Sequence, residues 1–170
     1  MEIPVGRYLV RPWQPKDATS LSTHLGNPKV TEQLLARHPN PYTVERALQW
    51  IELCRMEADP VNFAIANKTD AIGGVSLYLQ RGVRRHSAEI GFWIGEPFWN
   101  QGIATQVVQA FVDYAFTRFA LTRVFANVFS ANTASIRVLE KAGFLYEGMA
   151  VKSVNKDERF MDELSYAIVR

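Results

Sequence analysis

A change in the hydrophobic pattern near residue 100 limits the folds that this chain can adopt. Residues 61–67, 71–79 and 87–94 are short apolar runs separated by turn sequences, which predicts three successive strands. From Ile103 to about Arg118 apolar residues recur at helical spacing, and residues 123–129 are again typical of a strand. Strands and helices that follow each other in this way predict a sheet covered by helices.

The remaining elements can be placed by the same patterns. We expect a strand at residues 6–11, helices at about 15–25, 30–37 and 43–58, a short helix at 132–141, and closing strands at 144–151 and 160–168. Hairpins thus flank a single strand–loop–helix–strand–helix unit. We therefore predict an α/β (α+β) fold with a mixed, mostly antiparallel sheet, and one domain spanning residues 1–170.

Composition and charge exclude several classes of protein. A stretch of about 18 apolar residues, which a membrane helix needs, does not occur, and charged residues such as Glu2, Arg7 and Arg11 leave no apolar segment for a signal peptide. The single cysteine, Cys54, excludes an internal disulfide and fits a reducing compartment. Nineteen basic and seventeen acidic residues give a net charge of +2, too weak for nucleic-acid or anionic-membrane binding. We expect a cytoplasmic protein that binds neither nucleic acid nor membranes.

The segment Asn100–Thr105 connects a predicted strand to a predicted helix and is the sharpest local candidate for a binding site. A helix N-terminus presents unpaired N–H groups and the positive end of the helix dipole. Gly102 lets the backbone approach a ligand, and the small side chain of Ala104 leaves space at the first helical turn. Both features suit the binding of a pyrophosphate. The alternative is an ordinary turn that needs glycine, because neither a P-loop nor a Gly-x-Gly-x-x-Gly motif is present.

Glu89 is a carboxylate inside the apolar run 88–94. Burying a carboxylate is costly unless it is paired, so its presence in a strand is informative. Alternation places Glu89, Gly91 and Trp93 on one face, and Gly91 leaves a gap beside the carboxylate. A carboxylate that faces a gap can act as a general base. The alternative is a surface residue paired with Arg84 or Arg85.

Asn132 and Ser135 follow the predicted strand 123–129. Asn132 is a natural N-cap for the next helix, which would place Ser135 in the first helical turn. Capping alone explains both residues as well as a role in chemistry does. His24, His38 and His86 show no ligand spacing with each other or with Cys54, so no metal site is expected.

Taken in order, several segments together resemble the GNAT N-acetyltransferases, and more narrowly the ribosomal-protein N-terminal alanine acetyltransferases. The resemblance covers nearly the whole chain. It rests on Leu9-Val10-Arg11-Pro12 with Asp17-Ala18, Ala88–Ile94, Trp99–Thr105, Asn132-x-x-Ser135, Val138–Lys141 with Gly143-Phe144 and Glu147-Gly148, and Asp162 with Tyr166.

The resemblance implies a splayed central sheet with acetyl-CoA bound in the splay. The acetyl-CoA loop of the family matches at Gly102 and Ala104, whereas its first position is Trp99 here. The amides of Gln101, Gly102, Ile103, Ala104 and Thr105 would then hold the pyrophosphate. The backbone of Phe92, Trp93 and Ile94 would bind the pantetheine arm, and Asn132 would bind the pantetheine or the thioester end.

The same resemblance implies the chemistry. Many GNAT enzymes use a tyrosine as general acid at the position that is Leu139 here, and Ser135 matches the serine thought to take that role in this branch. We expect direct transfer of an acetyl group from acetyl-CoA to a primary amine. Glu89 would be the base, Ser135 the acid, and a strand N–H near Trp93 or Ile94 would stabilise the oxyanion. No covalent intermediate is required.

The acceptor and the alternatives stay open at this level. A protein N-terminus, an amino acid and a small amine all fit, whereas the absence of a dense acidic patch in residues 15–58 disfavours a polyamine. A homodimer is compatible with the resemblance. An acetyl-CoA-binding module without catalysis is the main alternative, but it would need neither Glu89 nor Ser135. A nucleic-acid-binding domain is disfavoured by the near-neutral charge.

Overall fold

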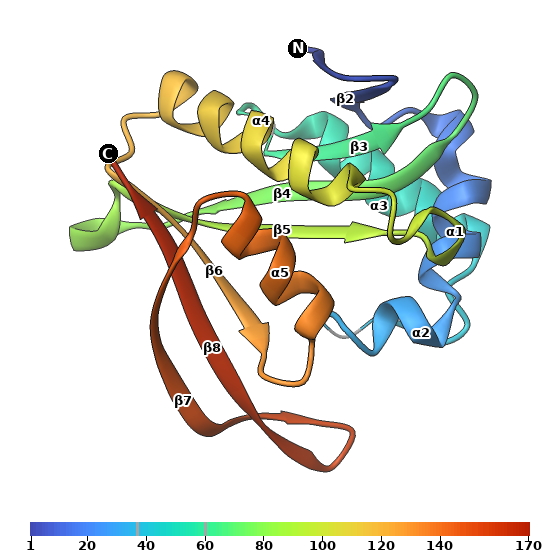
Figure 1. The fold of residues 1–170 in the computed structure, drawn as a ribbon. Helices are drawn as coiled ribbons and strands as arrows, with labels where there is room; N and C mark the ends of the chain where they lie inside the picture. The colour runs from blue at the N-terminus through green and yellow to red at the C-terminus, as the bar shows by residue number, and fades with distance from the viewer. Residues whose placement is uncertain (37, 60) are drawn as a thin grey trace.

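The computed structural model describes residues 1–36, 38–59 and 61–170. In this part of the chain, eight strands form a single sheet in the order β1-β2-β3-β4-β5-β6-β8-β7. All neighbouring strands are antiparallel except β5 and β6. Helices cover both faces of the sheet (Figure 1). The predicted mixed, mostly antiparallel α/β fold is confirmed.

The elements alternate between strands and helices as the sequence pattern indicates. The strands are β1 (Ile3–Val5), β2 (Tyr8–Pro12), β3 (Asn62–Ala66), β4 (Ala71–Leu79), β5 (Ser87–Ile94), β6 (Arg123–Phe129), β7 (Leu145–Lys156) and β8 (Arg159–Val169). The helices are α1 (Ala18–Leu25), α2 (Pro28–Thr31), α3 (Val44–Met56), α4 (Ile103–Arg118) and α5 (Thr133–Lys141). None of the described helices is long and apolar enough to cross a membrane.

Three predicted elements differ from the structure in extent. Gly6 adopts a positive φ of 58°, and the resulting turn adds β1 as a partner for β2. The helix expected at 30–37 is shorter and lies earlier in the chain. It is α2, which begins at Pro28 after the N-cap Asn27 and ends at Thr31. The end of that prediction, residue 37, lies outside the described residues. The closing hairpin is longer than predicted and turns at residues 157–158.

The sheet opens between β5 and β6. These two strands pair in parallel over only three positions, from Ser87 opposite Arg123 to Glu89 opposite Phe125. Beyond that point β5 stays with β4 as far as Ile94, whereas β6 stays with β8 as far as Phe129. The two halves of the sheet therefore diverge, as Figure 1 shows. The splay expected from the family resemblance begins at Glu89.

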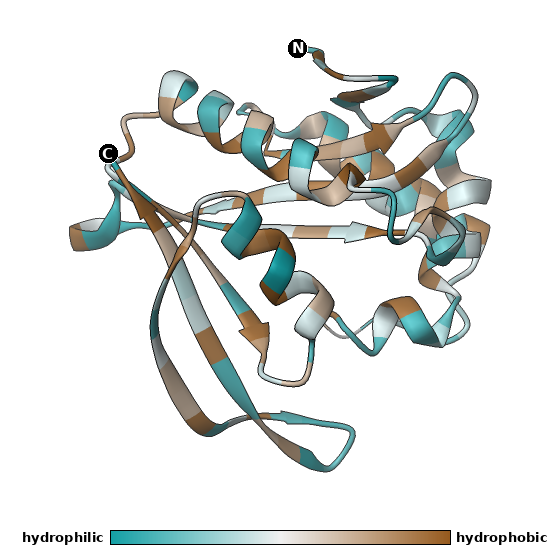
Figure 2. Ribbon diagram, viewed as in Figure 1, coloured by the Kyte–Doolittle hydropathy of each residue, from teal (hydrophilic) through white to brown (hydrophobic). Residues whose placement is uncertain are grey.

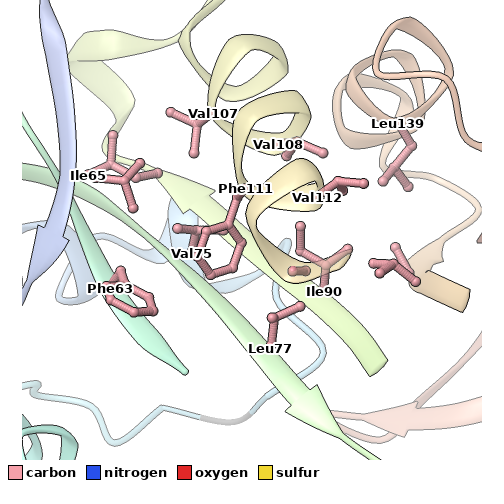
Figure 3. Close-up of a cluster of buried hydrophobic side chains, with 14 of the residues drawn as sticks. Phe63, Ile65, Val75, Leu77, Ile90, Val107, Val108, Phe111, Val112 and Leu139 are labelled. Carbon is pink, nitrogen blue, oxygen red and sulfur yellow. The ribbon is translucent and has the colours of Figure 1, made fainter. Parts of the chain in front are cut away.

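Two hydrophobic clusters hold the sheet between the helices. On one face, α4 packs its apolar stripe against the central strands, with Val107, Val108, Phe111 and Val112 beside strand residues such as Ile90 (Figure 3). On the other face, a smaller cluster around Trp13 joins α1 and α3 to the sheet. Hydrophobic residues concentrate in β3 and β4, while the turn between β7 and β8 is polar (Figure 2).

A buried ion pair fixes the start of α1. Arg11 on β2 donates two hydrogen bonds to Asp17, at 2.7 and 2.8 Å, and the two residues are 6% and 1% exposed. The backbone N–H of Gln14 donates a further bond of 2.9 Å to Asp17. Because both charges are satisfied, the pair locks the connection between β2 and α1 beneath Trp13.

Candidate active site

The N-terminus of α4 forms one wall of a cavity of about 550 Å³. Gly102 is the N-cap residue and has a φ of 73°, while Asn100, two residues earlier, has a φ of 59°. This left-handed turn brings the chain from Gln101 to Thr105 around the cavity. The first N–H groups of a helix have no intrahelical partners, so this wall offers hydrogen-bond donors and a partial positive charge.

The opposite wall of this cavity is formed by α5. Among the described lining residues, the charged side chains are Arg137 and Lys141, which lie one helical turn apart. No lining aspartate or glutamate opposes them among these residues. The cavity is therefore electropositive on both walls and suits an anionic ligand. The sequence-based prediction missed both cations, although their spacing places them on one face of the predicted helix 132–141.

The free edge of β5 runs along the same cavity. Gly95 N donates to Ile72 O at 2.8 Å, which fixes the alternation of the β4–β5 ladder. Along β5 the backbone N–H and C=O groups of successive residues point alternately toward β4 and away from it. Trp93, opposite Gly74, therefore turns its backbone groups toward β4, whereas Phe92 and Ile94 turn theirs toward the splay. The Ile94 carbonyl accepts a bond of 2.6 Å from Trp99 Nε1. Of the two N–H groups considered from the sequence, that of Ile94 therefore faces the splay and that of Trp93 does not, while Trp93 lines both cavities.

Asn132 and Ser135 lie where this cavity meets a second one of about 790 Å³, because both residues line both cavities. Asn132 is 6% exposed and is the N-cap of α5, accepting a bond of 3.1 Å from Ser135 N. Its Nδ2 donates to Gln33 O at 3.4 Å. The predicted cap is therefore present, and it aligns the half-buried Ser135 at the junction. The Ser135 hydroxyl makes no hydrogen bond within the described residues.

Seven aromatic side chains line the larger cavity, and residues of α1 and α3 form one of its walls. The ring of Trp13 contacts those of Trp50 and Trp93. It packs edge-on against Trp50, with ring centroids 5.2 Å apart, and stacks on Trp93, with centroids 6.5 Å apart. Among the described lining residues, Glu89 and Arg46 carry a formal charge. The aromatic lining residues are Trp13, Tyr42, Trp50, Phe63, Tyr78, Phe92 and Trp93.

Glu89 lines the larger cavity at the point where the sheet opens. Its Oε1 accepts a bond of 3.3 Å from Asn127 Nδ2, and Asn127 Oδ1 in turn accepts a bond of 2.9 Å from the Ser165 hydroxyl. Burial raises the pKa of Glu89, and the nearby negative charge of Glu163 raises this pKa further. A carboxylate with a raised pKa that lines a cavity is a candidate general base.

The alternative interpretation of Glu89 as a surface ion-pair residue is not supported. In the parts of the chain that the structure describes, neither Arg84 nor Arg85 forms a salt bridge with it. The expected gap at Gly91 is partly filled, because a Cβ there would lie 3.3 Å from the ring of Tyr78. Tyr78 stands opposite Glu89 on β4, so the carboxylate is bordered by a phenol as well as by Asn127.

The one cysteine of the chain, Cys54, lines neither cavity. Cys54 is buried on α3, and its burial raises the pKa of the thiol to about 12. A thiol of that pKa is a poor nucleophile. The described residues contain no cluster of three or more histidine, cysteine, aspartate or glutamate side chains that could hold a metal ion.

Known proteins match both the sequence and this geometry. The family model for the acetyltransferase (GNAT) domain matches residues 7–145. The Probable N-acetyltransferase YjcK of Bacillus subtilis is 37% identical over 170 residues, covering 94% of this chain and 92% of that protein.

Two solved structures have the same fold. RimJ of Mycobacterium smegmatis, in complex with CoA-disulfide, has a TM-score of 0.83 and 27% identity, and the match covers 98% of this chain and 83% of that one. The ribosomal-protein-S5-alanine acetyltransferase of Vibrio fischeri has a TM-score of 0.86 at 21% identity, covering 99% and 96%. With a family match over most of its length and a relative that spans almost all of it, this chain belongs to the GNAT family of acetyl-CoA-dependent N-acetyltransferases.

Proposed function

We propose that this enzyme transfers the acetyl group of acetyl-CoA directly to a primary amine inside the splay between β5 and β6. The observation that carries the proposal is the meeting of two different cavities at Asn132 and Ser135. One cavity is electropositive and suits a nucleotide with phosphates. The other contains Glu89, a carboxylate suited to accept a proton. A donor and an acceptor that occupy these cavities would meet at the junction.

The smaller cavity is the proposed acetyl-CoA site. The N–H groups from Gln101 to Thr105 would hold the pyrophosphate, and Arg137 and Lys141 would add charge-assisted contacts to phosphate. The backbone groups of Phe92 face this cavity and would bind an amide group of the pantetheine arm, which leaves the N–H of Ile94 for the thioester carbonyl. Asn132 would then lie beside the thioester.

The proposed chemistry uses few side chains. Glu89 accepts a proton from the incoming ammonium, directly or through one water, and the free amine attacks the thioester carbonyl. The N–H of Ile94 stabilises the oxyanion as it forms. When the carbon–sulfur bond breaks, Ser135 donates a proton to the departing thiolate and regains one, directly or through water, from the nitrogen of the new amide. The proton held by Glu89 then passes to solvent. Asn132 supports the departure of the thiolate because it caps α5, whose N-terminal dipole favours negative charge at the sulfur.

The larger cavity constrains the acceptor. Seven aromatic side chains line it, whereas Glu89 is its one carboxylate among the described lining residues. A polyamine needs several negative partners, so this lining disfavours it. We propose an amine attached to an apolar group, either a small molecule or the first residue of a protein chain. We also propose a cytoplasmic location, because the sequence has a single cysteine and no apolar segment typical of a signal peptide. A homodimer is proposed from the family resemblance.

An amine panel tests this proposal. Purified enzyme and acetyl-CoA would be incubated with phenethylamine, spermidine, and peptides that begin with Ala, Ser, Met or Phe, while release of free CoA thiol and formation of acetylated amine are followed. We expect turnover with at least one apolar amine or peptide, and the lowest kcat/KM with spermidine. Tight binding of acetyl-CoA without acetylation of any amine would support a non-catalytic module instead.

A further inference from the structure

Four consecutive backbone carbonyls, those of residues 31–34, accept hydrogen bonds from two side chains, one on β7 and one at the N-terminus of α5. Lys156 on β7 donates from Nζ to the carbonyl oxygens of Thr31 at 2.7 Å and Glu32 at 3.5 Å, and also to that of Leu34. Asn132 donates to the remaining one, Gln33 O. We call residues 31–34 the strap.

Lys156 is unusual in its surroundings. It is 9% exposed, and an ammonium group that is removed from water must be compensated by hydrogen bonds or opposite charge. The three strap carbonyls provide oxygen partners, and the ring of Phe129 on β6 lies 5.6 Å from Nζ. The lysine therefore joins β6 and β7, on one side of the splay, to the strap on the other.

The strap lies at the junction of the two cavities. Gln33 and Leu34 line both the acetyl-CoA cavity and the acceptor cavity, as do Asn132 and Ser135. Figure 1 shows the chain after α2 running toward the end of α5 where Asn132 caps the helix. The strap is thus a wall shared by both cavities, and its position affects the space in which donor and acceptor meet.

We infer that Lys156 is a positioning residue that holds the strap against Asn132 and so fixes the junction between the acetyl-CoA and acceptor cavities. Its effect on turnover rests on the proposed function. The route is short: Lys156 fixes the strap, Gln33 O holds the Asn132 side chain, and Asn132 holds the first turn of α5 with Ser135. A loosened strap would leave each cavity intact but would misplace the reacting groups, and a displacement of about 1 Å can cost roughly 10²-fold in rate.

Two substitutions separate charge from geometry. Lys156→Met keeps the length of the side chain and removes the donors, and Lys156→Arg keeps the charge with a planar, forked donor set. Lys152→Met, at an exposed lysine on the same strand, is the matched control. We expect Lys156→Met to lower kcat by about 10- to 100-fold with little change in the KM for acetyl-CoA. Lys156→Arg should retain part of the activity, and Lys152→Met should match the wild type.

A second readout does not depend on turnover. Amide hydrogen exchange at residues 32–34 and at Ser135 should be faster in Lys156→Met than in the wild type or in Lys152→Met. In addition, burial lowers the pKa of His38 and the positive charge of Lys156 lowers it further, so Lys156→Met should raise that pKa in an NMR titration. A higher pKa of His38 in Lys156→Met would show that the charge of Lys156 acts on His38 in the folded protein.

The outcomes distinguish the two proposals. Unchanged kcat in a folded Lys156→Met variant, or unchanged exchange at residues 32–34 and Ser135, would overturn the inference. If the wild type acetylates no amine, the proposed function fails, and the exchange measurement still decides whether Lys156 holds the strap and Asn132. A variant too unstable to purify would be replaced by Lys156→Gln, which retains a donor at shorter reach and carries the same expectations.

Discussion

Asn127 Nδ2 donates to Glu89 Oε1 at 3.3 Å, and Glu89 is the last residue of β5 that pairs with β6. The bond fixes the carboxylate at the point where the sheet opens, and Ser165 orients Asn127 from β8. Strand separation therefore creates the cavity and places the proposed base in it at the same time. The first two predictions concern this carboxylate.

Glu89→Gln keeps the shape of the side chain and removes its ability to accept a proton. We expect kcat/KM to fall on the order of 10²-fold, as is typical when a general base is lost. The deficit should shrink at high pH, because the acceptor amine then loses its proton without help. Steady-state kinetics across pH would measure this. A control at an exposed glutamate, Glu45→Gln, should behave as the wild type, and a loss that is equal at every pH would indicate a structural effect.

Glu163→Gln should change the pH dependence without removing the base. The negative charge of Glu163 raises the pKa of Glu89, so its removal lowers that pKa toward the ordinary carboxyl range. The acidic limb of kcat/KM, which reports the free enzyme, should therefore move to lower pH. An unchanged limb, or one that moves to higher pH, would argue that a group other than Glu89 sets it.

Ser135→Ala tests the proposed acid. Capping alone predicts a change of only a few tenths of a kcal/mol in helix stability and normal turnover. A role in protonating the thiolate predicts a kcat lower by about 10- to 100-fold, roughly 1.4–2.7 kcal/mol, with little change in the KM for acetyl-CoA. Ser135→Thr should restore part of the rate because it keeps a hydroxyl.

Asn132→Ala provides the contrast to Ser135→Ala. It removes both the α5 cap and a proposed acetyl-CoA contact, so we expect a higher KM for acetyl-CoA and a lower melting temperature together. Wild-type turnover by Ser135→Ala alongside an impaired Asn132→Ala would leave Ser135 without a catalytic role.

Gly102→Asp should abolish acetyl-CoA binding. The position has a φ of 73°, and an aspartate there would also bring negative charge to the proposed pyrophosphate site. Gly143→Asp is the matched control, because Gly143 also has a positive φ, of 93°, but lines neither cavity. Calorimetry should show loss of binding in the first variant only. Equal affinity in a folded Gly102→Asp protein would contradict the assignment of this loop.

Asp17→Asn tests the buried ion pair between β2 and the start of α1. Breaking a buried pair leaves Arg11 uncompensated, so we expect unfolding free energy to fall by about 3–5 kcal/mol. Chemical denaturation would measure the change, with Asp70→Asn, at an exposed turn, as the control. A change below about 1 kcal/mol, as for a surface pair, would contradict the importance given to this contact.

Local patterns predicted the parts of the fold that depend on neighbours in sequence. The helix at 103–118, the cap at Asn132 and the β3–β5 strands match the structure closely. Long-range features did not follow from these local patterns, and the splay of the sheet was expected only from the family resemblance. The pairing of β5 with β6 ends at Glu89, and this end point depends on how the two strands pair in three dimensions. The contact of Lys156 with the strap joins residues more than one hundred positions apart in the sequence. The short α2 was also mispredicted, because the apolar residues that follow it line the cavities and do not continue a helix.

Direct transfer within the splay is tested most directly by a single-turnover experiment with radiolabelled acetyl-CoA. Enzyme in excess would be mixed with the labelled donor, with and without the best acceptor from the amine panel, and quenched at successive times. We predict that label passes from CoA to the amine and that none is found on the protein at any time. Label covalently attached to the enzyme before it reaches the amine would contradict the account.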